Sequence, residues 1–122
     1  MTIHAEPDIV AKGELLRYLA PLTLERLISF FPLEGNAARI GSILYFQVPS
    51  SPGMGVEKGR VEGEQGLLAY WPMGKAVAIY LEKTRSYSPM NPLGRITGNL
   101  PALAKVKEGR RIAMSIDYPE DG

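Results

Sequence analysis

Glycine and proline recur throughout this chain and leave only short apolar stretches between them. The 122 residues include 13 glycines and 10 prolines. Because both residues favour turns and interrupt regular elements, their spacing predicts many short strands joined by turns. Short strands that follow one another in this way are typical of a sandwich or a barrel. The sequence therefore predicts a mainly β fold.

The strands are predicted from apolar and β-branched runs that end at turn residues. The most apolar run, residues 76–81, is expected to be central or closed into a barrel, because both of its faces are apolar. Loops are expected at 33–38, 49–60 and 84–92, and the segments 49–60 and 82–92 should be the least ordered. The predicted strands are 3–10 (interrupted by Pro7), 14–19, 43–48, 61–64, 67–71, 76–81, 93–96 and 111–116, with a hairpin that turns at Gly41-Ser42.

Two helices are expected. Apolar residues at i, i+3, i+4 and i+7 predict the first over 23–31, with Thr23 as its N-cap or first-turn residue and Pro32 ending it. The second is expected over 101–107, because Pro101 suits the first helical position and Gly109 suits the residue after the helix.

Composition excludes several kinds of chemistry. The formal net charge of +1 gives no electrostatic reason for binding nucleic acid or an anionic membrane. No apolar run approaches the ~20 residues of a membrane span, and we expect no signal peptide. There is no cysteine, and the single histidine is His4, so a Ser-His-Asp triad or a catalytic zinc site is not expected. We expect one cytoplasmic domain over residues 1–122 that requires no metal, flavin or nicotinamide cofactor.

Two sequence blocks carry a family resemblance. Residues 70–76 read Y-W-P-M-G-K-A and residues 91–96 read N-P-L-G-R-I. They resemble the Y-W-P-P-G-K-A and N-V-I-G-R-I blocks of an uncharacterised family of prokaryotic cyclophilin-like proteins. Residues 43–49 and 103–109 are similar to two further blocks of that family, and the resemblance covers about residues 14–116.

The resemblance implies a closed barrel of eight antiparallel strands with a short helix capping each end. The chain departs from the family at Met73, which replaces the second proline, at Leu67, which replaces an aspartate, and at residues 80–82, which replace a Phe-Phe-Gly run. These departures leave the expected fold intact. They argue against any family site that depends on the missing acidic or aromatic side chains.

The same resemblance raises the question of prolyl isomerase activity. True cyclophilins twist an X-Pro bond with the help of an arginine that binds the twisted state best. Gln47 stands where the resemblance would place that arginine, and glutamine donates hydrogen bonds but carries no charge. We therefore expect little or no isomerase activity, and lean against an enzyme. A weak peptidyl-prolyl cis-trans isomerase remains the alternative.

The preferred interpretation is a module that binds a small ligand or a peptide. Aromatic side chains would supply contact area, and two basic groups could hold a carboxylate or a phosphate. On apolar strands the aromatics could equally fill the core, and Arg95 could simply pair with an acid such as Glu82. The candidate pocket comprises Tyr45, Gln47, Tyr70, Trp71, Lys75, Tyr80 and Arg95, with no catalytic residue assigned. A homodimer formed through exposed barrel edges or through the helix with Phe30 and Phe31 is left open.

Overall fold

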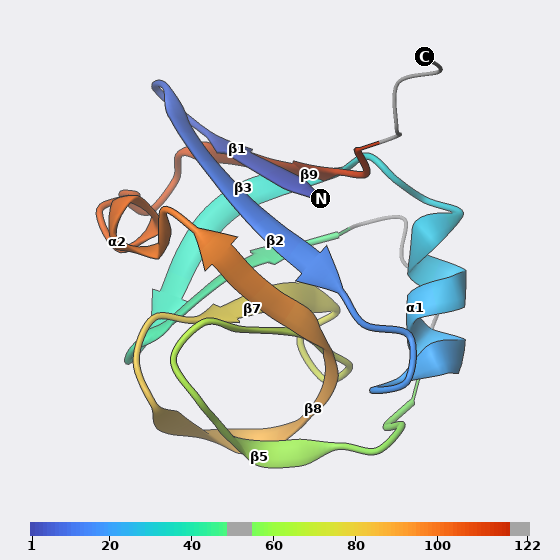
Figure 1. Ribbon diagram of the computed structural model, residues 1–122. Helices are drawn as coiled ribbons and strands as arrows, with labels where there is room; N and C mark the ends of the chain where they lie inside the picture. The colour runs from blue at the N-terminus through green and yellow to red at the C-terminus, as the bar shows by residue number, and fades with distance from the viewer. Residues whose placement is uncertain (49–54, 118–122) are drawn as a thin grey trace.

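A closed antiparallel sheet organises the protein, whose computed structural model describes residues 1–48 and 55–117. Eight strands form a ring in the order β2-β1-β9-β3-β4-β7-β6-β8, and the ring closes because β8 pairs with β2 as well as with β6 (Figure 1). In the described residues the ninth strand, β5, pairs with β8. The strands are β1 Thr2–Ala5, β2 Ile9–Leu15, β3 Leu33–Ile40, β4 Ile43–Gln47, β5 Arg60–Gly63, β6 Leu67–Trp71, β7 Ala76–Tyr80, β8 Thr84–Gly98 and β9 Arg111–Ser115.

Two short helices complete the fold and confirm the architecture expected from the sequence. Helix α1 (Pro21–Ile28) and helix α2 (Leu100–Leu103) lie on opposite sides of the ring in Figure 1. Leu27 of α1 and Leu103 of α2 are both fully buried in one core cluster inside the ring. The helices therefore cap the interior of the barrel.

The predicted loop at 84–92 is wrong, because these residues form the first half of β8. This strand of 15 residues begins beside β5 and then bends to run between β6 and β2 (Figure 1). The prolines made the segment read as a loop. Pro89 falls where the pairing of β5 with β8 shifts register, so its missing N–H does not interrupt a regular ladder.

The predicted loop at 33–38 is also wrong, because it belongs to β3. Gly35 and Asn36 lower the strand propensity of this segment. In the structure, residues 33–36 of β3 pair with β9, and residues 37–40 pair with β4. Tertiary pairing overrides the local signal. The predicted hairpin at Gly41-Ser42 is confirmed, since Ile40 and Ile43 are paired and Gly41 adopts a φ of +58°.

Several helix and strand boundaries in the structure differ from those predicted from the sequence. The predicted strand at 3–10 covers most of β1 and the first two residues of β2, which pair as a hairpin around Pro7. The predicted strand at 14–19 is wrong beyond Leu15, where β2 ends. Helix α1 starts at Pro21 and ends at Ile28, because the residue before Pro32 disfavours helical geometry; Thr23 lies in its first turn. Helix α2 gives way after Leu103 to i→i+3 turns, so Gly109 does not end it. The predicted loop 49–60 falls partly on residues 49–54, which lie outside the described residues.

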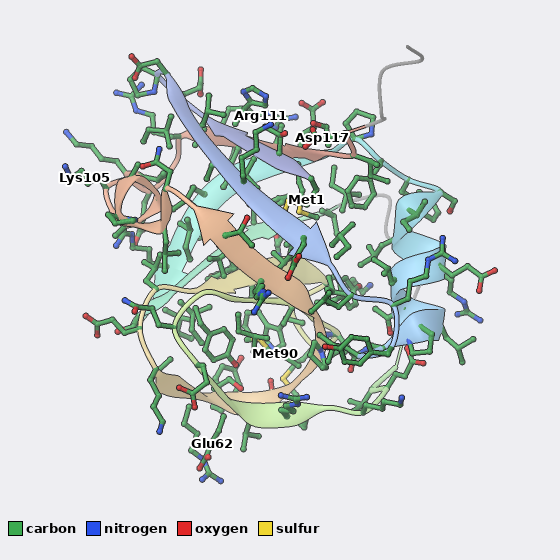
Figure 2. All side chains as sticks on the ribbon, viewed as in Figure 1. Met1, Glu62, Met90, Lys105, Arg111 and Asp117 are labelled. Carbon is green, nitrogen blue, oxygen red and sulfur yellow. The ribbon has the colours of Figure 1, made fainter. Side chains whose placement is uncertain are left out.

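The sheet has apolar clusters on both of its faces. The larger cluster fills the inside of the ring and includes Leu44, Phe46 and Leu68. The smaller cluster lies on the outer face of β4, β7 and β6. Met90 of β8 belongs to this outer cluster, and Figure 2 shows it within the space bounded by β5 and β8. The strand β7 is therefore buried on both faces, as the apolar run at 76–81 predicts.

Candidate functional site

Strand register places four of the seven predicted site residues on the outer face of the sheet. Gln47 pairs with Ala76, which in turn pairs with Trp71, so these three side chains form one row across β4, β7 and β6. Tyr45 lies two residues before Gln47 and therefore on the same face. Tyr80 shares this face, since it lies four residues after Ala76 on β7 and belongs to the same outer cluster.

The other three predicted residues lie elsewhere. Tyr70 points to the opposite face, where it is fully buried in the inner cluster. Arg95 is exposed on β8, and its Nε donates to Glu14 Oε1 at 2.5 Å, so its acidic partner is Glu14 and not Glu82. Lys75 adopts a φ of +50° in the turn between β6 and β7. The structure thus separates Tyr70 from Trp71, which the sequence analysis had placed in one pocket.

Trp71 is held rigidly from several directions. Its indole Nε1–H donates to Ser88 Oγ at 2.7 Å, and the side chain is only 6% exposed. The rings of Tyr45 and Tyr87 meet it edge-to-face, with centroids 5.4 and 5.6 Å away. The backbone of Gly74 lies against the indole, because a Cβ there would be 2.4 Å from the ring atom Cε3. This contact explains why position 74, in the turn after Trp71, is a glycine.

A cavity opens beside this indole. Its volume is about 180 Å³, and it lies between the turn that joins β3 to β4 and the first half of β8. The apolar residues Ile43, Trp71 and Met90 form much of its wall, and Ile40 and Tyr87 are exposed at the surface. The full lining is Ile40, Gly41, Ser42, Ile43, Trp71, Thr84, Arg85, Ser86, Tyr87 and Met90.

Of the seven predicted site residues, only Trp71 lines this cavity. Half of the lining comes from residues 84–90, which the sequence analysis took for a loop. Burial alternates along this segment, since Ser86, Ser88 and Met90 are buried whereas Arg85 and Tyr87 are exposed. The sequence carries no matching signal, because two of the buried residues are serines and one of the exposed residues is a tyrosine, so apolar and polar residues do not alternate.

Tyr45 and Gln47 line a different hollow on the same face of the sheet. This hollow of about 340 Å³ lies over β9, β3 and β4 and also includes Asn36 and Arg111. The Gln47 amide donates to the carbonyl of Gly74 at 3.3 Å, which leaves the glutamine tied to the turn beneath Trp71. Arg111 Nη2 lies 3.5 Å from a carboxylate oxygen of Glu34.

Tyr80 carries a hydroxyl with unmet hydrogen-bonding capacity. The ring is fully buried and packs against Gly63, whose Cβ would lie 2.5 Å from the ring atom Cε2. Within the part of the chain that the structure describes, the buried hydroxyl has no hydrogen-bond partner. Tyr80 is paired with Ile43, so this polar atom belongs to the layer that forms the cavity wall.

A hydrogen-bond network fixes β8 immediately after Met90. The fully buried amide of Asn91 accepts from Glu57 N–H at 2.8 Å and donates to Thr23 Oγ1 and to the Gly55 carbonyl. The Glu57 carboxylate accepts from the N–H groups of Leu22 and Thr23 at the start of α1, and from the Thr23 hydroxyl. Desolvation raises the pKa of Glu57, but these hydrogen bonds together outweigh it and hold the pKa below its ordinary value.

The described residues show neither a metal centre nor a membrane helix. Across residues 1–48 and 55–117, no group of three His, Cys, Asp or Glu side chains is placed to bind a metal ion. Over the same residues, no helix is long and apolar enough to cross a membrane. What the site offers chemically is a mainly apolar cavity whose lining also includes the hydroxyl-bearing residues Ser42, Thr84 and Ser86.

Comparison with known proteins identifies the fold. The model of the family described as Cyclophilin-like matches residues 1–115. The solution structure of the hypothetical protein AF2241 from Archaeoglobus fulgidus is similar, with a TM-score of 0.76, 27% identity and coverage of 93% of this chain and 91% of that one. McbB in complex with tryptophan has a TM-score of 0.76 at 16% identity; the match covers 92% of this chain and 43% of McbB. No curated protein matches the chain.

Proposed function

Since the chain belongs to the cyclophilin-like family, we propose that it is a binding module that takes an apolar group of a small molecule or peptide into the cavity beside Trp71. The observation that carries the proposal is the combination of an open, mainly apolar cavity with an indole wall that is already fixed. Ser88, Gly74 and two tyrosine rings hold this indole in place. A pre-formed wall lowers the entropic cost of binding.

The cavity volume limits the size of the group it holds. About 180 Å³ lies below the range of roughly 300–1,000 Å³ that is usual for drug-sized ligands. The space suits a single hydrophobic side chain or a comparably small apolar molecule. A larger ligand would leave most of its atoms outside, over the exposed side chains of Ile40 and Tyr87.

The structural neighbours support ligand binding at the level of the fold. McbB has a structure in complex with tryptophan, so a protein that contains this fold binds a small molecule with an aromatic group. AF2241 is an archaeal protein and is described as hypothetical. We further propose that the chain is a single domain from a prokaryote and that it works in the cytoplasm. Whether it forms a homodimer is left open.

The test is a titration followed at the one tryptophan of the chain. N-acetylated amides of leucine, isoleucine, methionine and phenylalanine are added to ¹⁵N-labelled protein, and the indole N–H resonance is recorded. We expect at least one amide to shift this resonance saturably. Ile40→Ala should weaken that binding several-fold, because Ile40 lines the cavity. Val10→Ala is the matched control: Val10 is similarly exposed (42% against 39% for Ile40) but does not line the cavity, so this variant should bind like the wild type. No shift with any amide would overturn the proposal.

Weak prolyl isomerase activity is a second candidate, and one observation favours it. The hollow that contains Gln47 also contains the guanidinium of Arg111, so a cation is present in that hollow although not at position 47. Because Arg111 forms an ion pair with Glu34, its positive charge is partly neutralised and would stabilise a twisted amide less. We therefore expect an isomerase rate far below that of a true cyclophilin.

A further inference from the structure

The free edge of β5 bears on whether the chain forms a homodimer. This strand (Arg60–Gly63) is the last in the strand order, and in the described residues it pairs only with β8. Figure 1 shows it at the periphery of the molecule. The outer edge of such a strand directs backbone N–H and C=O groups away from the sheet, where a second chain can add a strand.

A hollow runs along this edge. Its volume is about 580 Å³, and its lining consists of residues 59–64 and Leu67. Residues that point to both faces of the strand line it, and no residue of β8 does, as expected for a hollow along the edge that faces away from β8. A strand added to β5 would occupy this hollow.

The segment around β5 carries a self-complementary charge pattern. Residues 58–64 read K-G-R-V-E-G-E, so two cations precede Val61 and two anions follow it at matching distances. The four charged residues are exposed, whereas Val61 is half-buried and Gly63 is buried. Figure 2 shows Glu62 pointing outward from β5. Read backwards, the segment has the same pattern with the signs of its charges reversed.

This pattern selects one register for the pairing of two β5 strands. A two-fold axis places residue i of one strand opposite residue j of the other, and j opposite i. An axis at Val61 brings Arg60 of each strand opposite Glu62 of the other. An axis moved by one residue in either direction places Arg60 opposite Arg60, or Glu62 opposite Glu62. Like charges directly opposite each other are destabilising, so the register at Val61 is favoured.

Contacts within the chain leave these side chains available to a second copy. Arg60 forms no ion pair with any other described residue. Glu62 Oε1 lies 3.5 Å from Arg85 Nη1, but both side chains are more than 70% exposed, so this pair contributes little. Lys58 lies before the regular strand, with a φ of +51°, and donates to a backbone carbonyl at 3.2 Å. The central pairs of Arg60 with Glu62 therefore carry the complementarity.

From this arrangement we propose that two copies of the chain associate through their β5 edges into a two-fold symmetric dimer, with Arg60 of each copy opposite Glu62 of the other. The sheet would then continue from β8 through both β5 strands to the second β8. Because β5 has only four residues, the contact is small and we expect a dissociation constant of roughly 10 μM to 1 mM. No residue of β5 lines the cavity beside Trp71, so the dimer is independent of the proposed function.

The experiment measures the oligomeric state of the wild type and of two charge-reversal variants. Sedimentation and ¹⁵N spectra are recorded over a concentration range that spans the expected dissociation constants. The wild type should show a monomer–dimer equilibrium, with concentration-dependent shifts at the amides of residues 59–64. Arg60→Glu and Glu62→Arg each place like charges opposite one another at both symmetric pairs, so each should weaken the dimer by about tenfold or more.

An equimolar mixture of the two variants is the decisive sample. It restores both opposite-charge pairs, so the two variants should form a heterodimer about as tightly as the wild type forms its homodimer. Arg110→Glu is the matched control, because it reverses an exposed arginine outside β5 and should leave the dimer unchanged. Circular dichroism verifies that each variant is folded.

Three results would overturn the proposal. The first is a wild type that stays monomeric up to about 1 mM, where a dimer of the expected affinity would be populated. The second is a dimer that both charge reversals leave intact, because that dimer forms through another surface. The third is a dimer that both variants lose and the mixture does not restore, because Arg60 and Glu62 are then not opposite each other.

Discussion

The glycine at position 74 is expected to be essential for the geometry of the site. In Gly74→Ala the new Cβ would lie 2.4 Å from Trp71 Cε3 and 2.7 Å from Cζ3. Ordinary carbon–carbon contacts are about 3.5–4.0 Å, so the indole must retreat by roughly 1 Å. Its hydrogen bond to Ser88 and its edge-to-face contacts with Tyr45 and Tyr87 oppose that movement.

The expected cost follows from these contacts. Overpacking of a filled core usually costs about 1–3 kcal/mol, and weakening of the Ser88 hydrogen bond adds about 1 kcal/mol. We expect Gly74→Ala to lower the free energy of unfolding by about 2–4 kcal/mol. For a chain of this length that corresponds to a fall in Tm of roughly 8–16 °C. The fluorescence maximum of the single tryptophan should shift as well, because its environment changes.

The control is the same substitution where space is available. In Gly98→Ala the new Cβ would lie 3.6 Å from Lys12 Cβ, an ordinary contact, so stability should change by less than about 0.5 kcal/mol. Both variants are unfolded thermally and in urea, with circular dichroism and tryptophan fluorescence as probes. If Gly74→Ala proves as stable as Gly98→Ala, the indole is not held against the turn, and the account of a fixed cavity wall fails.

Three further predictions test other parts of the structure. Glu57→Gln should destabilise the protein by about 1 kcal/mol in urea unfolding at pH 7, because it weakens the capping of α1, whereas Glu25→Gln on the same helix should have no effect. The folded-state pKa of Glu57 is lowered, so its contribution is present above about pH 4.5 and is lost as the pH falls through the lowered pKa; a gap between wild type and Glu57→Gln that does not narrow as the pH is lowered below 4.5 would contradict this. Tyr80→Phe should raise the free energy of unfolding by about 1 kcal/mol, since its buried hydroxyl lacks a partner among the described residues, and a loss of stability would show that the hydroxyl is bonded. In a protease-coupled assay on a short X-Pro peptide the wild type should show little or no rate and Gln47→Arg a small gain, whereas a wild-type rate near that of a true cyclophilin would refute our interpretation of Gln47.

The sequence predicts the barrel well because its strongest local signals agree with the tertiary structure. Residues 67–71 and 76–81 are apolar, β-branched or aromatic, and turn residues bound them, so each forms a strand close to its predicted limits. The segments 33–38 and 84–92 were assigned to loops because glycine, asparagine and proline lower strand propensity. In the folded protein, pairing with neighbouring strands outweighs these preferences.

The site was harder to predict because a strand alternates its side chains between two faces. Tyr70 and Trp71 are adjacent in sequence, yet one fills the barrel and the other lies outside it. The sequence alone does not show that the first half of β8 covers the outer face. Without that knowledge, Arg85 and Tyr87 read as loop residues, although they complete the cavity beside Trp71.

The most direct test of the binding module is an isotope-filtered NOE experiment on labelled protein with the amide that binds best. Our account predicts intermolecular NOEs from the ligand's apolar side chain to the Trp71 indole protons and to the methyl groups of Ile43 and Met90, which line the same cavity. NOEs confined to Tyr45 and other residues of the hollow around Gln47 and Arg111 would contradict it. That result would place the ligand on the neighbouring part of the sheet instead.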